Sequence, residues 1–198
     1  MSPHSTLIST RLANSAKLAI SRPARHSFFE PVAFSLACAA LVIAGLDADL
    51  LSKFIFIATL IVVSIVDLNQ RIIPNRMLAP AALAGVVILA IGSGDQLPAG
   101  LVGALGAGGF LLLVAVGAPG AMGMGDVKLA AVMGLYLGPA VAPALLIALI
   151  AASAFGLAVM FRNGIKRGRK ATIAFGPFLS AGAVLALFIG QGIVAWYL

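Results

Sequence analysis

The sequence predicts an all-α polytopic membrane protein with about six to seven transmembrane helices. Of its 198 residues, 62% are hydrophobic and only 10% are charged, and the mean hydropathy is +1.12. Counting glycine as apolar and leaving tyrosine out raises the apolar share to roughly 72%, against about 45–50% in soluble domains. A soluble fold of this length cannot bury so much apolar surface. The composition therefore excludes a soluble enzyme, a disordered chain and a disulfide scaffold.

The chain divides into a basic cytoplasmic tail, residues 1–30, and a transmembrane domain, residues 31–198. The tail lacks the layout of a cleaved signal peptide and is either disordered or a surface amphipathic segment. A transmembrane helix takes about 20 residues, so two of the apolar stretches beyond the tail, 54–68 and 127–138, are short for a crossing. The apolar stretches are 31–51, 54–68, 77–93, 97–117, 127–138, 140–161 and 173–197.

The basic residues indicate how the helices are oriented. With the tail in the cytoplasm and all seven stretches crossing, every one of the 13 Lys and Arg residues except Lys53 falls on the cytoplasmic side. Cytoplasmic loops of membrane proteins collect basic residues. We therefore expect a multi-pass protein of the bacterial inner membrane with a cytoplasmic N-terminus. The same rule accounts for the formal net charge of +7 without a nucleic-acid partner.

Two acids, Asp67 and Asp126, stand out at membrane segments. Asp67 ends one apolar stretch, and Asp126 opens another behind a Gly-x-Gly sequence. Two crossings, 77–93 and 97–117, separate them, so both carboxyl groups are predicted at the cytoplasmic edge. Ionisable groups at membrane depth are costly and mark function. The alternative is that each only marks a helix end, but two acids at one depth on one face favour a functional pair.

A close pair of carboxyl groups can hydrolyse a peptide without a metal, because one keeps its proton while the other activates water. Gly123 and Gly125 would let a substrate strand lie against the backbone beside Asp126, although a glycine-rich turn explains them too. No histidine follows the tail, which excludes a Ser–His protease and a His-ligated zinc protease. We expect neither a metal nor a cofactor.

Three segments in this order resemble the type IV prepilin peptidases, which are intramembrane aspartyl proteases of the GxGD type. The resemblance extends from about residue 34 to the end. It implies that Asp67 and Asp126 are the catalytic pair. It also implies a prepilin or pseudopilin substrate, cut on the cytoplasmic side between a short basic leader and an apolar helix. The segments are Asp67 with Arg71-Ile72-Ile73-Pro74-Asn75, then Gly123-Met124-Gly125-Asp126-Val127-Lys128, and last Phe175-Gly176-Pro177-Phe178-Leu179.

Other residues are expected to support this pair. We expect Lys128 to anchor its helix in lipid headgroups, or to favour an ionised carboxylate. Asn75 is expected either to position substrate or water or to form a turn, and Ser64 to hydrogen-bond Asp67 one turn later. The full set of supporting motif residues is Gly123, Gly125, Lys128, Pro74, Asn75, Gly176 and Pro177.

The chain also departs from part of the family. Bifunctional members carry a cytoplasmic region with paired cysteines, whereas Cys38 is the one cysteine here. We therefore expect no N-methyltransferase activity. In this respect the chain resembles the short, peptidase-only members found with tight-adherence (Flp) pilus systems.

Three alternatives remain open. One alternative is another GxGD intramembrane protease, from a branch that carries a Pro-Ala-Leu motif late in the chain. This chain contains Pro143-Ala144-Leu145, but only 17 residues after Asp126, which is too close for that motif. A proton-coupled carrier also uses membrane acids, typically near the midplane and with internal repeats. A structural scaffold would use the aspartates only as boundary residues. Neither the pilin partner nor the oligomeric state follows from the sequence.

Overall fold

The computed structural model describes residues 47–92, 94–118, 122–163 and 174–197, together with residues 37, 40, 41, 44 and 45. Within these ranges the chain is helical and contains no strand. The predicted tail, 1–30, and most of the first apolar stretch, 31–51, lie outside the described residues. The bounded helices are α3 (Ala48–Gln70), α4 (Asn75–Gly92), α5 (Leu97–Gly117), α6 (Met124–Leu137), the 3-10 helix η1 (Gly138–Ala140), α7 (Val141–Asn163) and α9 (Gly176–Tyr197).

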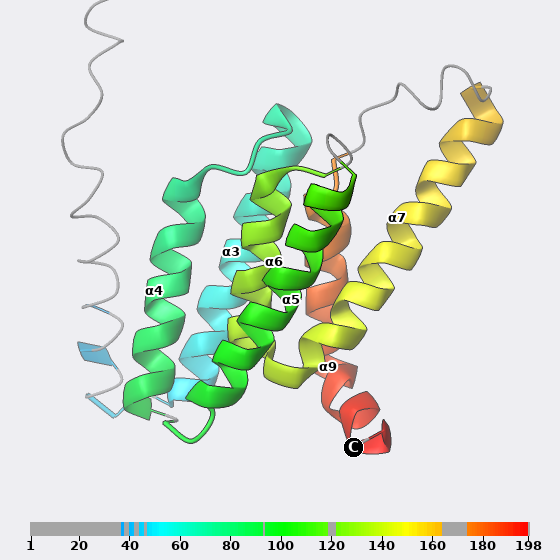
Figure 1. The fold of residues 1–198 in the computed structure, drawn as a ribbon. Helices are drawn as coiled ribbons and strands as arrows, with labels where there is room; N and C mark the ends of the chain where they lie inside the picture. The colour runs from blue at the N-terminus through cyan, green and yellow to red at the C-terminus, as the bar shows by residue number, and fades with distance from the viewer. Residues whose placement is uncertain are drawn as a thin grey trace, which may run out of the picture.

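Successive helices alternate in direction (Figure 1). In that view α3, α5 and α7 rise toward the upper end of the bundle, and α4, α6 and α9 descend from it. The connection from α3 to α4 is only residues 71–74, and short connections make neighbouring helices antiparallel. The C-terminal end of α3 and the N-terminal ends of α6 and α9 therefore lie at the same end of the bundle.

Helix α3 begins at Ala48, before the predicted apolar stretch 54–68, because an N-cap residue and not the apolar stretch determines where the helix starts. Asp47 Oδ1 accepts the N–H of Asp49 at 2.9 Å, the contact by which an N-cap residue satisfies the first turn of a helix. Lys53 pairs with Asp49 at 2.6 Å within the helix. As a result α3 has 23 residues and is long enough to cross, although stretch 54–68 by itself is short.

Backbone geometry ends two of the helices. Arg71 closes α3 with φ 54°, in the left-handed region, and its N–H donates to Asp67 O at 2.8 Å. Gly138 follows α6 with φ 54°, a conformation that glycine adopts at little cost. The chain then reverses through η1 into α7 (Figure 1).

Helix α6 lies at the centre and contacts α3, α4, α5, α7 and α9. One tie across it involves Tyr136, whose ring stacks on Phe56 of α3 with centroids 4.8 Å apart. The Tyr136 hydroxyl donates to Ala81 O of α4 at 2.7 Å. Most of the largest fully buried side chains belong to one core cluster around this centre, and Ile88 belongs to a smaller separate one. The members of the main cluster are Phe56, Leu60, Val63, Leu111, Leu129, Met133 and Leu179.

Helices α5 and α6 approach each other closely through glycine. A Cβ placed on Gly134 would collide with the backbone oxygen of Gly103, and a Cβ on Gly108 would lie 2.9 Å from Ala131 Cβ. Small residues that bring backbones together are typical of helix packing in membranes, where van der Waals contact replaces the hydrophobic effect. These glycines hold α6 in place against α5.

The fold class predicted from the sequence is confirmed. By length and composition, α3, α4, α5 and residues 124–162 qualify as membrane-spanning segments, and the last of these comprises α6, η1 and most of α7. Large apolar side chains such as Leu105 and Phe161 are exposed on these helices. The chain is an all-α, multi-pass membrane protein, and the helices from α3 to α9 correspond to six of the seven predicted stretches.

The tight contact between α5 and α6 predicts a stability difference between two glycine substitutions. Gly134→Ala should destabilise the protein by about 1–3 kcal/mol, the usual effect of overpacking, because the new methyl group meets the Gly103 backbone. Gly106→Ala is the matched control, since a Cβ there has nothing within 4 Å. Thermal unfolding in detergent measures both, and equal melting temperatures would contradict the prediction.

Candidate active site

Three helix ends meet at the upper end of the bundle in Figure 1. They are the C-terminal end of α3, which carries Asp67, and the N-terminal ends of α6 and α9, which carry Asp126 and Gly176. The structure thus places the two predicted aspartates at one end of the molecule, as the count of crossings requires. It adds the first residue of α9 to them.

Asp67 is held in place by the start of α9. Its side chain is only 5% exposed, and Oδ2 accepts the backbone N–H of Gly176 at 2.8 Å. The first N–H groups of a helix have no partner within the helix, so a carboxylate satisfies one of them and is favoured by the helix dipole. A Cβ on Gly176 would lie 2.7 Å from Asp67 Oδ2. Only glycine therefore permits this approach without a shift.

Asp126 lies in the first turn of α6 and is less enclosed than Asp67. Its N–H donates to Gly123 O at 3.1 Å, and Gly123 is the extended N-cap residue of the helix. A Cβ on Gly123 would lie 3.3 Å from Asp126 Oδ2, so the carboxyl group folds back over the cap. The Asp67 and Asp126 carboxyl groups are close enough to repel one another electrostatically when both are ionised.

The segment that follows α3 packs on the start of α6. A Cβ on Gly125 would lie 2.9 Å from Ile73 Cβ, so the missing side chain makes room for Ile73. Beyond Pro74, Asn75 begins α4, and its Oδ1 accepts a hydrogen bond from Lys128 Nζ at 2.9 Å. The connection that leaves Asp67 therefore reaches the helix that carries Asp126.

Some expectations for the supporting residues need correction. Ser64 Oγ donates to Leu60 O at 2.7 Å, so the expected bond from Ser64 to Asp67 is wrong; a hydroxyl in an apolar helix satisfies itself on the preceding turn. Asn75 lies in the turn that starts α4, where the Met77 N–H donates to Pro74 O at 3.1 Å, and its side chain also bonds Lys128. Pro177 follows Gly176 in the first turn of α9. Ile73 was not singled out from the sequence, because one isoleucine gives no contrast in so apolar a chain.

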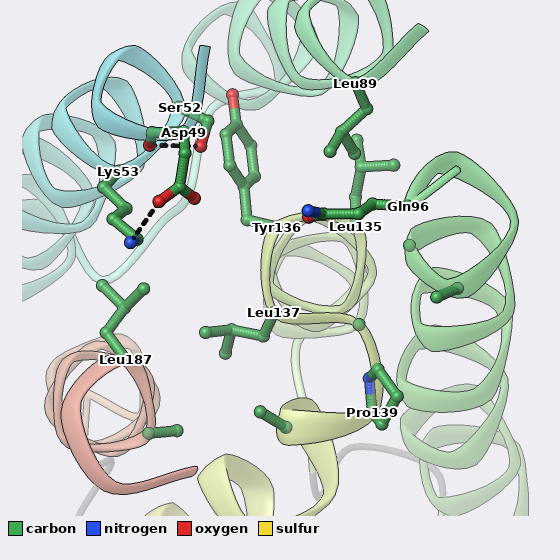
Figure 2. A pocket seen from close by; sticks show the side chains of 15 residues that line it. Asp49, Ser52, Lys53, Leu89, Gln96, Leu135, Tyr136, Leu137, Pro139 and Leu187 are labelled. Carbon is green, nitrogen blue, oxygen red and sulfur yellow. Dashed lines mark hydrogen bonds and ion pairs between the residues drawn. The ribbon is translucent and has the colours of Figure 1, made fainter. Parts of the chain in front are cut away.

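A pocket lies at the opposite end of the bundle from the aspartates, and Figure 2 shows it from close by. It is a pocket of about 500 Å³ whose lining includes Asp49, Ser52, Lys53, Gln96 and Tyr136. At 1.5 Å per residue, the 18 steps along α3 from Asp49 to Asp67 span about 27 Å. The pocket is therefore separate from the aspartates. Within the described part of the chain, no group of three or more His, Cys, Asp or Glu side chains is arranged to hold a metal ion.

Known proteins match this chain across the region that contains both aspartates. A sequence profile described as the type IV leader peptidase family matches residues 54–161. The chain is 33% identical over 184 residues to the prepilin leader peptidase/N-methyltransferase of Bacillus subtilis (strain 168), covering 88% of this chain and 71% of that protein.

Relatives from other bacteria carry the same name. The protein of Burkholderia pseudomallei (strain 1026b) is 32% identical over 176 residues, covering 84% of this chain and 55% of its own length. The protein of Legionella pneumophila is 29% identical over 180 residues, covering 88% and 62%. This chain thus spans little more than half the length of these two proteins. No solved structure matches it significantly.

The family match covers Asp67, the segment that follows it and Gly123 to Asp126, which are the residues that the fold brings to one end. More than half of the chain lies within the matched region, and the Bacillus relative exceeds 30% identity over most of both chains. The chain belongs to the type IV leader peptidase family.

Proposed function

We propose that this protein is an intramembrane aspartyl endopeptidase that removes the leader of prepilins or pseudopilins. The observation that carries the proposal is the meeting of Asp67 and Asp126 at one end of a membrane helix bundle, in a chain of this family. The relatives named prepilin leader peptidase support the choice of substrate.

The proposed reaction uses the pair as one unit that shares a proton. Two neighbouring carboxyl groups do not both ionise readily, so one is a carboxylate and the other a carboxylic acid. The carboxylate takes a proton from water as the water oxygen attacks the scissile carbonyl carbon, and the acid donates its proton to the carbonyl oxygen. When the tetrahedral gem-diol breaks down, the C–N bond breaks and the aspartate that took the proton from water gives it to the departing amine. The other aspartate takes a proton from a gem-diol hydroxyl as the carbonyl re-forms, so both groups return to their starting states.

The geometry supports different roles in substrate access for the two side chains. Asp67 is enclosed and bonded to Gly176, which fixes its position, whereas Asp126 is only partly buried beside a cap of glycine residues. A peptide strand approaching the site meets Asp126 first. Low side-chain bulk at Gly123 supports this close approach of a second backbone.

The charge distribution supports a cytoplasmic location for the site. Among described residues, Arg71, Arg76, Lys128 and Arg162 lie near the end of the bundle that carries the aspartates, and Lys53 lies near the other end. By the positive-inside rule, this distribution supports our proposal that the aspartates lie at the cytoplasmic face of the inner membrane and that the N-terminus is cytoplasmic. A basic leader followed by an apolar helix would reach the site from that face, and the bilayer would hold its helix.

The aspartate pair predicts that either carboxyl group is indispensable. Asp67→Asn and Asp126→Asn should each reduce cleavage of a co-expressed prepilin to background, because one amide cannot exchange a proton with the other residue. Asp95→Asn is the matched control, since Asp95 lies in the turn before α5 at the opposite end. The shortened product is measured on gels.

The outcomes separate the alternatives. Cleavage that persists in both aspartate variants would contradict the pair. If the wild-type protein leaves prepilin intact but cuts other membrane helices, it is a different GxGD protease. If it leaves prepilin intact and moves protons together with a solute, it is a carrier.

The contact between α9 and Asp67 predicts a second effect on activity. Gly176→Ala should lower the turnover number by roughly 10- to 100-fold, because the added methyl group displaces Asp67, and a shift near 1 Å at a reacting group costs about that much. Gly192→Ala is the control on the same helix, with nothing within 4 Å of the added Cβ. Steady-state cleavage of purified prepilin measures both variants, and equal turnover would sink the idea.

We also propose that the protein trims prepilins of the Flp type without methylating them, although the relatives' names include an N-methyltransferase. The trimmed pilin should carry an unmodified N-terminal amine when S-adenosylmethionine is present. Mass spectrometry of the new N-terminal peptide tests this, with the Bacillus relative as a positive control. A methylated product would overturn the expectation drawn from Cys38.

A further inference from the structure

The contact between the connection after α3 and the start of α6 has no part in the proposed proton transfers. It consists of two features on either side of Pro74. Ile73 occupies the space above Gly125, and Lys128 Nζ donates to Asn75 Oδ1 at 2.9 Å. These residues come from segments about fifty residues apart, so the contact determines how two parts of the fold lie together.

Lys128 bonds an uncharged partner rather than an aspartate. The one ion pair among the described residues joins Asp49 and Lys53 at the other end of the bundle. Lys128 follows Asp126 by two positions, and residues two apart on a helix do not face each other. Its hydrogen bond to Asn75 therefore links α6 to α4, on a side of α6 that Asp126 does not occupy.

Helix stability gives no reason for a cation at this place. Lys128 lies in the first turns of α6, and its ammonium group bonds the first residue of α4. The N-terminal end of a helix carries partial positive charge and favours anions, so both helices disfavour the ammonium group. The helix dipoles therefore do not account for the cation, whereas its bond to Asn75 gives it a structural role.

The contact is connected to both aspartates through short stretches of backbone. On one side, the Arg71 N–H donates to Asp67 O at 2.8 Å, and two residues later Ile73 meets Gly125. On the other side, Gly125 directly precedes Asp126. A displacement of residues 71–75 from α6 would therefore change the distance between the two carboxyl groups.

We propose that Lys128 and Asn75 are positioning residues, which hold residues 71–75 against α6 and thereby set the spacing of Asp67 and Asp126. This inference rests on the proposed function where it is tested by measuring prepilin cleavage. It assigns Lys128 a role between helices, in place of anchoring in lipid headgroups.

A double-mutant cycle tests the proposal. Asn75→Leu and Lys128→Met should each lower the turnover number for prepilin by about tenfold with little change in KM, because the aspartates are misplaced while substrate contacts remain. The double variant should be no worse than either single one, since both remove the same bond. Asn75→Asp keeps the acceptor and Lys128→Arg keeps the donor, so each of these variants should retain activity. Lys53→Met removes a cation at the other end and serves as the control.

Hydrogen exchange provides a readout that needs no catalysis. In detergent, the backbone amides of residues 71–73 and 75 should exchange faster in Asn75→Leu and Lys128→Met than in the wild type or Lys53→Met. Wild-type protein without prepilin cleavage would refute the proposed function, and the exchange data would still decide whether the contact holds the segment.

Three results would overturn the inference. In the first, Lys128→Met loses activity while Asn75→Leu does not, which would make Lys128 a lipid anchor or a substrate contact. In the second, the losses of the single variants add in the double variant. In the third, exchange at residues 71–73 and 75 is unchanged by either substitution.

Discussion

The hydrogen bond from the Gly176 N–H to Asp67 Oδ2 ties the site to the fold, because a carboxyl group enclosed in an apolar bundle requires a donor. A side-chain donor would bring bulk or charge of its own, whereas a helix start supplies a backbone N–H that lacks an internal partner. The requirement then extends outward. Residue 176 has to be glycine, α9 has to begin at this depth, and α3 has to end just beyond Asp67.

The alternating helices meet these requirements through packing rather than through further polar bonds. Glycine contacts draw α5 and α6 together, and the ring of Tyr136 against Phe56 ties α6 to α3. These contacts lie below the aspartates, in the part of the bundle that faces lipid. Apolar packing thus positions the helix ends at the upper end of the bundle. Short connections between these helices are then enough to bring the polar groups of the site together.

The sequence was informative where physical chemistry leaves a trace in residue type. Charge scarcity predicted a membrane bundle, and counting crossings predicted that Asp67 and Asp126 share one end, which the helix directions confirm. The partners of these residues were harder to predict. A backbone donor such as the Gly176 N–H has no side-chain signature, although the Gly-Pro motif marked its place. Ile73 is one apolar residue among many, and Ser64 had a nearer acceptor in Leu60 O than the expected Asp67. The role expected for Lys128 rested on its charge alone, whereas its hydrogen bond to Asn75 depends on how the helices pack.

The origin of the Asp67 partner in α9 has a consequence for biosynthesis. Helices enter the membrane in the order in which the ribosome makes them, and α9 follows all the other helices that meet here. Asp67 is therefore inserted more than a hundred residues before its donor exists, and it must wait in the bilayer without that bond. A nascent chain that has released α3 to α7 carries both acids but lacks the group that orients one of them. The bond that orients Asp67 therefore forms only once α9 has been inserted, after all the other described helices.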